Sequence, residues 1–227
     1  KEDELARFPL HALEGIVAFT YAGASPALMG ACAKRNVSLC FCTPNGRFLA
    51  RAVGEVNGNV LLRRIQYRCA DDPNQSCRIA RNMVFGKVFN CHWSIERTIR
   101  DNSMRVNAEK LGNASQILKN ALPEITRAET LDCLRGLEGE AAAVYFSVLD
   151  EMILNNKDEF FFRGRSRRPP LDKMNALLSF IYALLANDCA SALESVGLDS
   201  YVGFLHRDRP GRSSLALDLM EELRPCF

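Results

Sequence analysis

The hydrophobic pattern of this chain changes near residue 71, and no other feature of the sequence constrains the fold as much. Before that point, the runs at 15–20 and 37–42 are short, rich in β-favouring residues and bounded by turn residues, which is typical of strands. After it, from the segment 71–99 onward, apolar residues recur at spacings near 3.6, the period of an amphipathic helix. We therefore expect a strand-rich part followed by a helical part.

The N-terminal part carries signals for a hairpin and one helix. Asn45-Gly46 tolerates positive φ and predicts a hairpin turn that leads into a strand at 47–53. A further strand is predicted at 60–65, joined through Asn57-Gly58-Asn59. Residues 25–33 begin with Ser and Pro, which is a helix-start signal.

The C-terminal part carries the periodicity of four helices, predicted at 71–99, 129–153, 172–196 and 213–223. The predicted fold class is α+β, with a small β-strand-rich N-terminal domain followed by a larger all-α C-terminal domain. The first domain is expected to span residues 1–66 and the second residues 67–227.

The cysteines indicate packing rather than metal or disulfide chemistry. Nine are scattered without a CxxC pair, whereas zinc sites use paired thiolates and disulfide scaffolds are small secreted chains. Cys40 and Cys42 lie two apart in an apolar run and are expected to face the core from one side of a strand. This favours a reducing, cytoplasmic location. No apolar run approaches the roughly 18 to 20 residues that cross a membrane, and the net charge of +2 indicates no partner by itself.

The last predicted helix has an apolar back and an acidic front. At about 100° per residue, Asp218 and Glu221 project together from the side opposite the apolar residues. His206 closes an apolar stretch just upstream, and an imidazole with carboxylates suits Mn²⁺ and can serve Mg²⁺. A structural histidine and a solvated acidic helix face are the alternatives.

Glu138 lies between two glycines, Gly136 and Gly139. Each glycine costs about 1 kcal/mol in a helix interior, so helix stability does not explain them. Their missing side chains allow another backbone or a nucleic acid to approach and leave Glu138 uncovered. A helix C-cap at either glycine explains them equally well.

A basic run precedes Pro169-Pro170, which hold it extended. Guanidinium groups in such a run bind phosphates without sequence preference, although a solvated basic loop is the alternative. The candidate DNA contacts are Arg163, Arg165, Arg167 and Arg168 in this run and, more weakly, Lys87, Arg209 and Arg212.

Residues on both sides of the run have simpler interpretations. Phe160 to Phe162 is interpreted as an anchor for the loop rather than a base-stacking platform. Asp172, Asn175 and Ser179 recur at helical spacing and can form a layer behind the metal ligands. Equally, Asp172 can simply cap the helix.

Three blocks of the sequence together resemble one known family. They begin at Arg135-Gly136-Leu137-Glu138-Gly139, at Arg168-Pro169-Pro170-Leu171-Asp172 and at Val202-Gly203-Phe204-Leu205-His206. In this order they resemble the CRISPR-associated spacer-acquisition integrase, the larger member of the universal adaptation pair, and the third block is most similar to type I-C members. Family members have strands before the first residue of this chain and continue beyond its last helix. The first domain is therefore expected to be truncated at its start and the second at its end.

The resemblance implies a metal-dependent DNA endonuclease and integrase. In the family, a divalent ion, Mg²⁺ or Mn²⁺, is held by a glutamate of the first block, the histidine of the third and an acidic residue fifteen positions later. Here these are Glu138, His206 and Glu221 (206 + 15 = 221), with Asp218 as a candidate additional ligand. The family reaction inserts captured foreign DNA into the repeat array by attack of a 3′-hydroxyl on a phosphodiester. A divalent ion can stabilise the charge that develops there.

The resemblance also implies partners. These are double-stranded DNA, as foreign fragment and CRISPR repeat, a second copy of the chain in a homodimer, and a small CRISPR adaptation protein. A CRISPR-associated exonuclease is a further candidate, and no membrane is expected. The alternative function is a non-catalytic DNA-binding scaffold subunit of an adaptation complex, which would not depend on metal. A metal-dependent nuclease outside CRISPR systems is a third possibility.

Overall fold

The computed structural model describes residues 6–54 and 59–226 of the 227-residue chain. A small sheet lies near the N-terminus and helices make up most of the chain after it, so the predicted fold class is confirmed. The elements in chain order are η1 (Leu10–Ala12), β1 (Gly15–Phe19), α1 (Pro26–Lys34), β2 (Ser38–Cys42), β3 (Phe48–Ala52), α2 (Val60–Asp71), α3 (Pro73–Asn102), α4 (Ala108–Arg127), α5 (Leu131–Met152), α6 (Lys173–Ser195), α7 (Ser214–Leu223) and η2 (Arg224–Cys226).

The sheet has three strands, and β2 lies in its middle, parallel to β1 and antiparallel to β3. α1 connects the parallel pair, and Ser25 caps it by accepting a hydrogen bond from the Leu28 N–H at 3.2 Å. Gly46 makes the predicted hairpin turn at φ 81°, a conformation that suits glycine. Cys40 and Cys42 are buried free thiols, as expected. The strands predicted at 15–20, 37–42 and 47–53 are confirmed.

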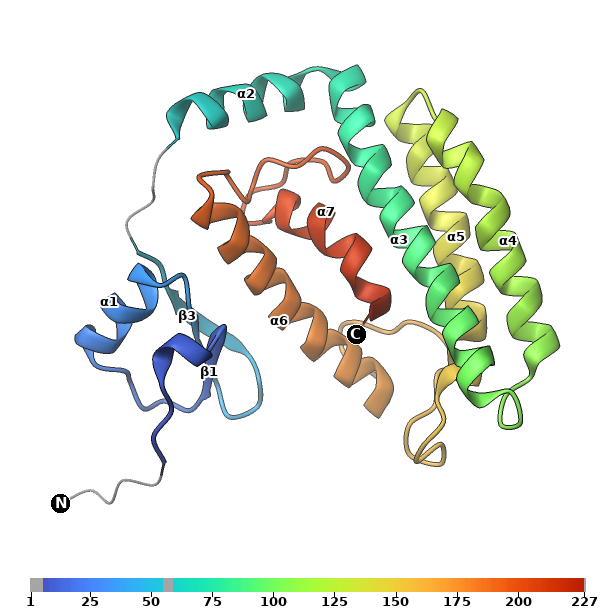
Figure 1. Cartoon of the computed structure of the whole chain (residues 1–227), viewed down its shortest axis with the longest axis horizontal. Coiled ribbons are helices and arrows are strands. Elements are labelled where there is room, and N and C mark those ends of the chain that lie inside the picture. The colour runs from blue at the N-terminus through green and yellow to red at the C-terminus, as the bar shows by residue number, and fades with distance from the viewer. Residues whose placement is uncertain (1–5, 55–58, 227) are drawn as a thin grey trace.

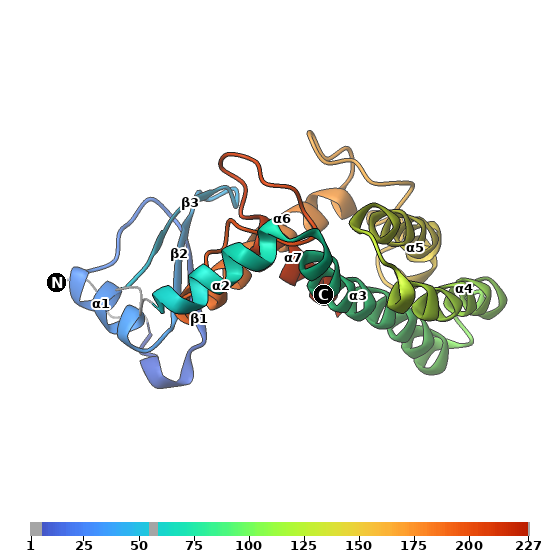
Figure 2. The same ribbon diagram turned by 90° about the horizontal axis from the view of Figure 1, so that it is seen from above.

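α3 is the central element of the helical part. α4 and α5 run along one side of it and α7 packs on the other (Figure 1). Val84, Val88 and Ile95 recur along α3 and are fully buried in the core that it shares with α4 and α5. α6 and α7 share a second core. From above, the molecule is elongated, with the sheet at one end and α4 and α5 at the other (Figure 2).

Arg51 of β3 ties the sheet to α6. Its guanidinium forms an ion pair with Glu194 and donates hydrogen bonds to the Asn187 carbonyl and the Ser191 hydroxyl, both at 3.3 Å. Because the partners Asn187, Ser191 and Glu194 span about two turns of α6, this one side chain fixes the strand along the helix.

Gln66 of α2 is almost fully buried and anchors the chain that leads to His206. Its amide group donates to the carbonyls of Asp199 and Val202 at 2.7 and 2.9 Å, and its oxygen accepts from the Asp199 N–H. α2 therefore belongs to the helical part. The domain boundary predicted after residue 66 falls inside this helix.

Two elements differ from the predictions. Residues 60–65, predicted as a strand, begin α2, because Asn59 caps the helix on the Leu62 N–H at 3.1 Å and tertiary contacts outweigh a β-favouring composition. The part of the predicted link before Asn59 lies outside the described residues. α4 has no counterpart among the predicted helices, although Leu111, Leu118 and Ile125 are buried at helical spacing.

α6 also departs from expectation in its apolar character. In the described part of the chain, it is a helix long and apolar enough to cross a membrane by length and composition, whereas no such segment was expected. Core helices of soluble proteins meet the same criterion, and α6 packs against α7 and, through Arg51, against the sheet. Its composition alone is therefore weak support for a membrane span.

Candidate active site at the junction of α3, α5 and α7

Asp218 of α7 is fully buried and organises the turn that carries His206. Its Oδ2 accepts hydrogen bonds from the N–H groups of Phe204 and Leu205 at 2.6 and 2.9 Å. Its Oδ1 accepts from the His206 N–H at 3.0 Å and lies 2.5 Å from His206 Nδ1. An ionised carboxylate only accepts, so Nδ1 carries a proton and a neutral ring keeps a lone pair on Nε2. Asp218 therefore fixes both the position and the tautomer of His206.

Gly203 and Arg135 hold the same turn in place. A Cβ atom at residue 203 would lie 2.9 Å from Asp218 Oδ2 and 2.9 Å from the Ser214 backbone, so no side chain fits there. From α5, Arg135 donates to the Leu205 carbonyl through Nε at 3.0 Å and Nη2 at 2.8 Å. Glu138 follows Arg135 by three residues, on the same side of α5. The turn with His206 is thereby fixed next to the part of α5 that carries Glu138.

Lys87 of α3 connects the two predicted glutamate ligands. Its ammonium contacts Glu138 Oε1 and lies 2.7 Å from Glu221 Oε2. The exposed fractions of the side chains are 8% for Lys87, 3% for Glu221 and 24% for Glu138. Burial by itself lowers the pKa of Lys87, but the carboxylates of Glu221 and Glu138 outweigh it and hold the pKa above its ordinary value. The ammonium is therefore charged and lies between two carboxylates.

Arg224 completes this cluster from the other side. It forms an ion pair with Glu221 Oε1, and its Cζ lies 5.0 Å from the centre of the Tyr182 ring. Arg224 and Arg135 are site residues for which the sequence predicted no role. The available signal was spacing, because each stands three residues from a predicted glutamate ligand.

The donor set fits a hard divalent ion. In the part of the chain that the structure describes, no three His, Cys, Asp or Glu side chains converge closely enough to hold a metal. The donor types nevertheless suit such an ion, because Glu138 and Glu221 already share one cation, Lys87, and Arg135 holds the turn that carries His206 against α5. Burial raises the pKa of the Cys91 thiol to about 12, so Cys91 is protonated in the protein without metal. The four donors around Asp218 favour a supporting role for it over the predicted role of additional ligand.

Two glycines next to Glu138 in the sequence leave part of the α5 surface open. The helix is continuous from Leu131 to Met152, so the C-cap explanation for Gly136 and Gly139 is wrong. A Cβ atom at either glycine would meet nothing within 4 Å. No packing in the described residues therefore requires these glycines, and the helix surface over them is accessible to a ligand.

The basic run divides into exposed and inward-facing arginines. Arg163, Arg167 and Arg168 are exposed. Arg165 is half-buried and donates to Asn175 Oδ1 at 2.8 Å and to Ser179 Oγ at 3.1 Å. Arg165 therefore holds the loop, whereas the other three present exposed guanidinium groups, with Arg163 Cζ 5.0 Å from the centre of the Phe161 ring.

The residues around this loop have structural roles. Asp172 caps α6 by accepting from the Asn175 N–H at 2.7 Å, which confirms the capping interpretation. Phe162 is buried and stacks on Phe146 with ring centres 5.6 Å apart, which confirms the anchor interpretation. Asn175 accepts from the Ser166 N–H at 3.0 Å and so supports the arginine loop.

The weaker DNA candidates lie in different surroundings. Lys87 is buried between the two glutamates. Arg212 donates to the Arg207 carbonyl and to Ser214 Oγ within its own loop, whereas Arg209 is exposed. Among these three, only Arg209 is exposed in this arrangement.

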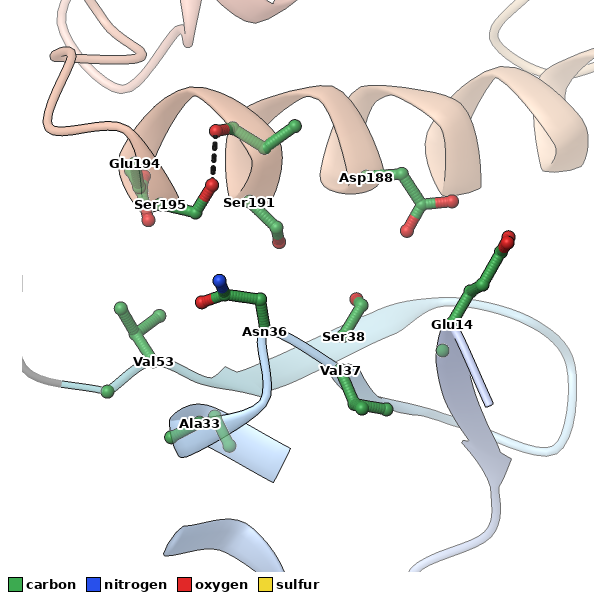
Figure 3. A pocket seen from close by; sticks show the side chains of 14 residues that line it. Glu14, Ala33, Asn36, Val37, Ser38, Val53, Asp188, Ser191, Glu194 and Ser195 are labelled. Carbon is green, nitrogen blue, oxygen red and sulfur yellow. Dashed lines mark hydrogen bonds between the residues drawn. The ribbon is translucent and has the colours of Figure 1, made fainter. Parts of the chain in front are cut away.

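Two cavities differ in their suitability for DNA. One, of about 560 Å³, reaches His206, and its charged lining residues are Arg135, Arg207, Asp71 and Asp208. The other, of about 510 Å³, separates α6 from the sheet. There Glu14 and Asp188 project from opposite walls (Figure 3), and none of the described residues that line it is basic. Phosphates would be repelled from the second cavity, so the first is the better candidate.

Comparisons with known proteins identify the family to which this chain belongs. A family model described as CRISPR associated protein Cas1 matches residues 1–227. A Chlorobaculum tepidum protein named CRISPR-associated endonuclease Cas1 1 is 50% identical over 221 residues, which are 97% of this chain and 64% of the relative. The chain thus spans less than two thirds of that relative.

Two solved structures share the fold. A Cas1 protein from Thermotoga maritima has a TM-score of 0.71 at 23% identity, over 96% of this chain and 66% of the other. A casposase bound to an integration product has a TM-score of 0.71 at 24% identity, over 93% of this chain and 57% of the other. Since the family model covers the full length of the sequence, this chain belongs to the Cas1 family of CRISPR-associated proteins.

Proposed function

We propose that this chain carries the catalytic centre of a metal-dependent DNA integrase and endonuclease of CRISPR adaptation. The observation that supports this most directly is the junction of α3, α5 and α7. There Glu138 and Glu221 face one another across Lys87, Asp218 of α7 orients His206, and Arg135 of α5 holds the turn that carries this histidine. Membership of the Cas1 family and the likeness to a casposase support the same reaction class.

In this proposal Glu138, Glu221 and His206 Nε2 hold Mg²⁺ or Mn²⁺. When bound, such an ion supplies charge stabilisation for the phosphate oxygens during phosphoryl transfer. The chain's own residues prepare the site: Asp218 keeps the Nδ1 proton in place, so that the ring offers Nε2 and not Nδ1. In the strand-transfer reaction the 3′-hydroxyl of the captured fragment forms a new phosphodiester, and the displaced strand leaves with its own 3′-hydroxyl. Water as the attacking group gives endonuclease activity.

The surface beside Glu138 supports the approach of DNA. Gly136 and Gly139 present no side chains, and the space beside them is open. Arg163, Arg167 and Arg168 are exposed on a loop that Asn175 and Phe162 hold in place. Phosphate contacts from such arginines supply affinity that falls with salt.

Further proposals concern assembly and context. We propose a homodimer that works with a small CRISPR adaptation protein in the cytoplasm, and a system of type I-C. Matches to a Cas6-RT-Cas1–Cas2 complex and to a Cas4 exonuclease/Cas1 endonuclease fusion support partners of these kinds. A repeat array and a gene for the small partner next to the gene for this chain would support the context, and an isolated gene would count against it.

The test is integration of a DNA fragment with a 3′-hydroxyl end into a repeat-containing duplex, with Mn²⁺ or with EDTA. Glu138→Gln and His206→Ala are expected to abolish strand transfer while circular dichroism stays unchanged. Glu140→Gln is the matched control, because Glu140 is an exposed residue of the same helix. Unchanged products in EDTA would leave the scaffold subunit as the better function. Equal cleavage of DNA with and without repeats would favour a nuclease outside CRISPR systems.

A further inference from the structure

Glu221 has a cation at each of its carboxylate oxygens. Oε1 pairs with Arg224, and Oε2 lies 2.7 Å from Lys87 Nζ. The side chain is 3% exposed, so bulk water has little access to it. A further cation that approaches Glu221 therefore meets the positive charge of one that is already there.

Lys87 is the cation that two carboxylates share. Its ammonium lies 2.7 Å from Glu221 Oε2 and contacts Glu138 Oε1, whereas Arg224 pairs with the other oxygen of Glu221. The ammonium thus occupies the space between the two carboxylates that are proposed to share a divalent ion. An ammonium and a divalent ion carry charge of the same sign and compete for the same oxygens.

We infer that Lys87 is a built-in counterion of the Glu138–Glu221 pair, which a divalent ion displaces when it binds. The inference rests on the proposed metal site and adds a residue that sets its affinity. Without metal, the ammonium lies between two carboxylates that would otherwise repel each other across the α3–α5–α7 junction, and Arg224 supplies the second positive charge that balances them. With metal, its positive charge is surplus, so the ammonium has to leave the carboxylates, and the affinity of the site is reduced by that exchange.

The alternative is that Lys87 stays in place and supports the ligands from behind. A carboxylate has about four lone-pair sites, and among the described residues Glu138 Oε2 faces no cation that would block a metal. In that arrangement, removal of the ammonium would disorder the ligands and weaken metal binding. The two arrangements therefore predict opposite changes in metal affinity for the same substitution.

The experiment is calorimetric titration of Mn²⁺ into the protein without DNA, so that the readout is binding and not activity. Lys87→Met removes the charge and keeps most of the side-chain volume. Lys110→Met is the matched control, because Lys110 pairs with Glu151 at 3.1 Å on the exposed surface of α4 and α5. We expect Lys87→Met to bind Mn²⁺ at least about fivefold more tightly than the wild type, the lower end of typical coupling between ligands. Lys110→Met should match the wild type.

The outcomes separate this inference from the proposed function. In one outcome, the wild type binds Mn²⁺, His206→Ala does not, and Lys87→Met binds Mn²⁺ no more tightly than the wild type. This result would overturn the counterion role of Lys87 but would still support the metal site. Absence of a His206-dependent site in both proteins would overturn both proposals. Another outcome is that Lys87→Met is unfolded without metal. Recovery of its circular dichroism spectrum on addition of Mn²⁺ would then support the inference, because the ion replaces the ammonium. Failure of Mn²⁺ to restore folding would count against it.

Discussion

Replacement of Asp218 by Asn tests whether this carboxylate builds the turn that carries His206. Asn has nearly the same shape but offers one acceptor oxygen and one NH₂ donor. Whichever way the amide turns, two of the four donors around residue 218 would face an NH₂ group and lose their acceptor. A hydrogen bond to a charged group contributes about 1.5 to 3 kcal/mol. Asp218→Asn should therefore lower the free energy of unfolding by about 3 to 6 kcal/mol.

The assay is urea and thermal unfolding of Asp218→Asn beside Asp132→Asn. Asp132 is 82% exposed and also pairs with a residue of the site, Arg135, so its substitution removes a charge nearby without burying an unpaired donor. At about 2 to 4 °C per kcal/mol for a chain of this size, the first variant should lose about 6 °C or more, whereas the second should stay within about 0.5 kcal/mol of the wild type. Loss of less than about 1 kcal/mol in Asp218→Asn would refute the view that its four contacts hold the turn.

Four further substitutions extend the test to the surface beside Glu138, the arginine loop and the core. Gly139→Ala should stabilise the protein by about 0.5 to 1 kcal/mol, because the added Cβ meets nothing and glycine disfavours a helix. The same substitution should slow integration. Unchanged integration would show that DNA does not approach the helix at this residue. Arg168→Ala should reduce the salt slope of DNA binding by about one unit without loss of stability. Arg165→Ala, which loses hydrogen bonds to Asn175 and Ser179, should instead lower the Tm. A larger loss of Tm in Arg168→Ala than in Arg165→Ala would contradict the assignment of Arg165 to loop support and of Arg168 to DNA binding. Ile95→Ala should cost about 2 to 5 kcal/mol in urea unfolding, since Ile95 is fully buried; a cost below about 1 kcal/mol would contradict the central place of α3.

Local signals account for the elements that the sequence predicts correctly. Ser25 and Asp172 cap α1 and α6 with the hydrogen bonds that their side chains are suited to make, and Gly46 makes the turn between β2 and β3. Each of these depends only on residues a few positions away. α2 depends on more, because Gln66 is held by residues 199 and 202, which lie more than a hundred positions later. Composition alone therefore gave a strand where long-range contacts favour a helix.

The candidate site shows the same limit. Helical periodicity places Asp218 and Glu221 on one face of α7, and both are buried as that face meets its neighbours. Periodicity does not show that Asp218 contacts the turn before α7 while Glu221 contacts α3. Nor does it join Glu221 to Glu138, which lies 83 positions earlier (221 − 138). Only the packing of three helices brings Lys87 between them.

The charge arrangement at this junction argues for chemistry over stability. Buried ion pairs are weak stabilisers, because the cost of removing two charges from water is close to what their attraction returns, and apolar residues of similar volume often do as well. If this junction of three helices served packing alone, we would expect it to resemble the neighbouring core. There α3 contributes the buried apolar residues Val84, Val88 and Ile95. Instead, one turn of α3 carries an ammonium into the space between two carboxylates. Such a cluster contributes little to stability. It does keep two carboxylates close together, with their charge balanced, until a divalent ion binds, which is what a metal-dependent site requires.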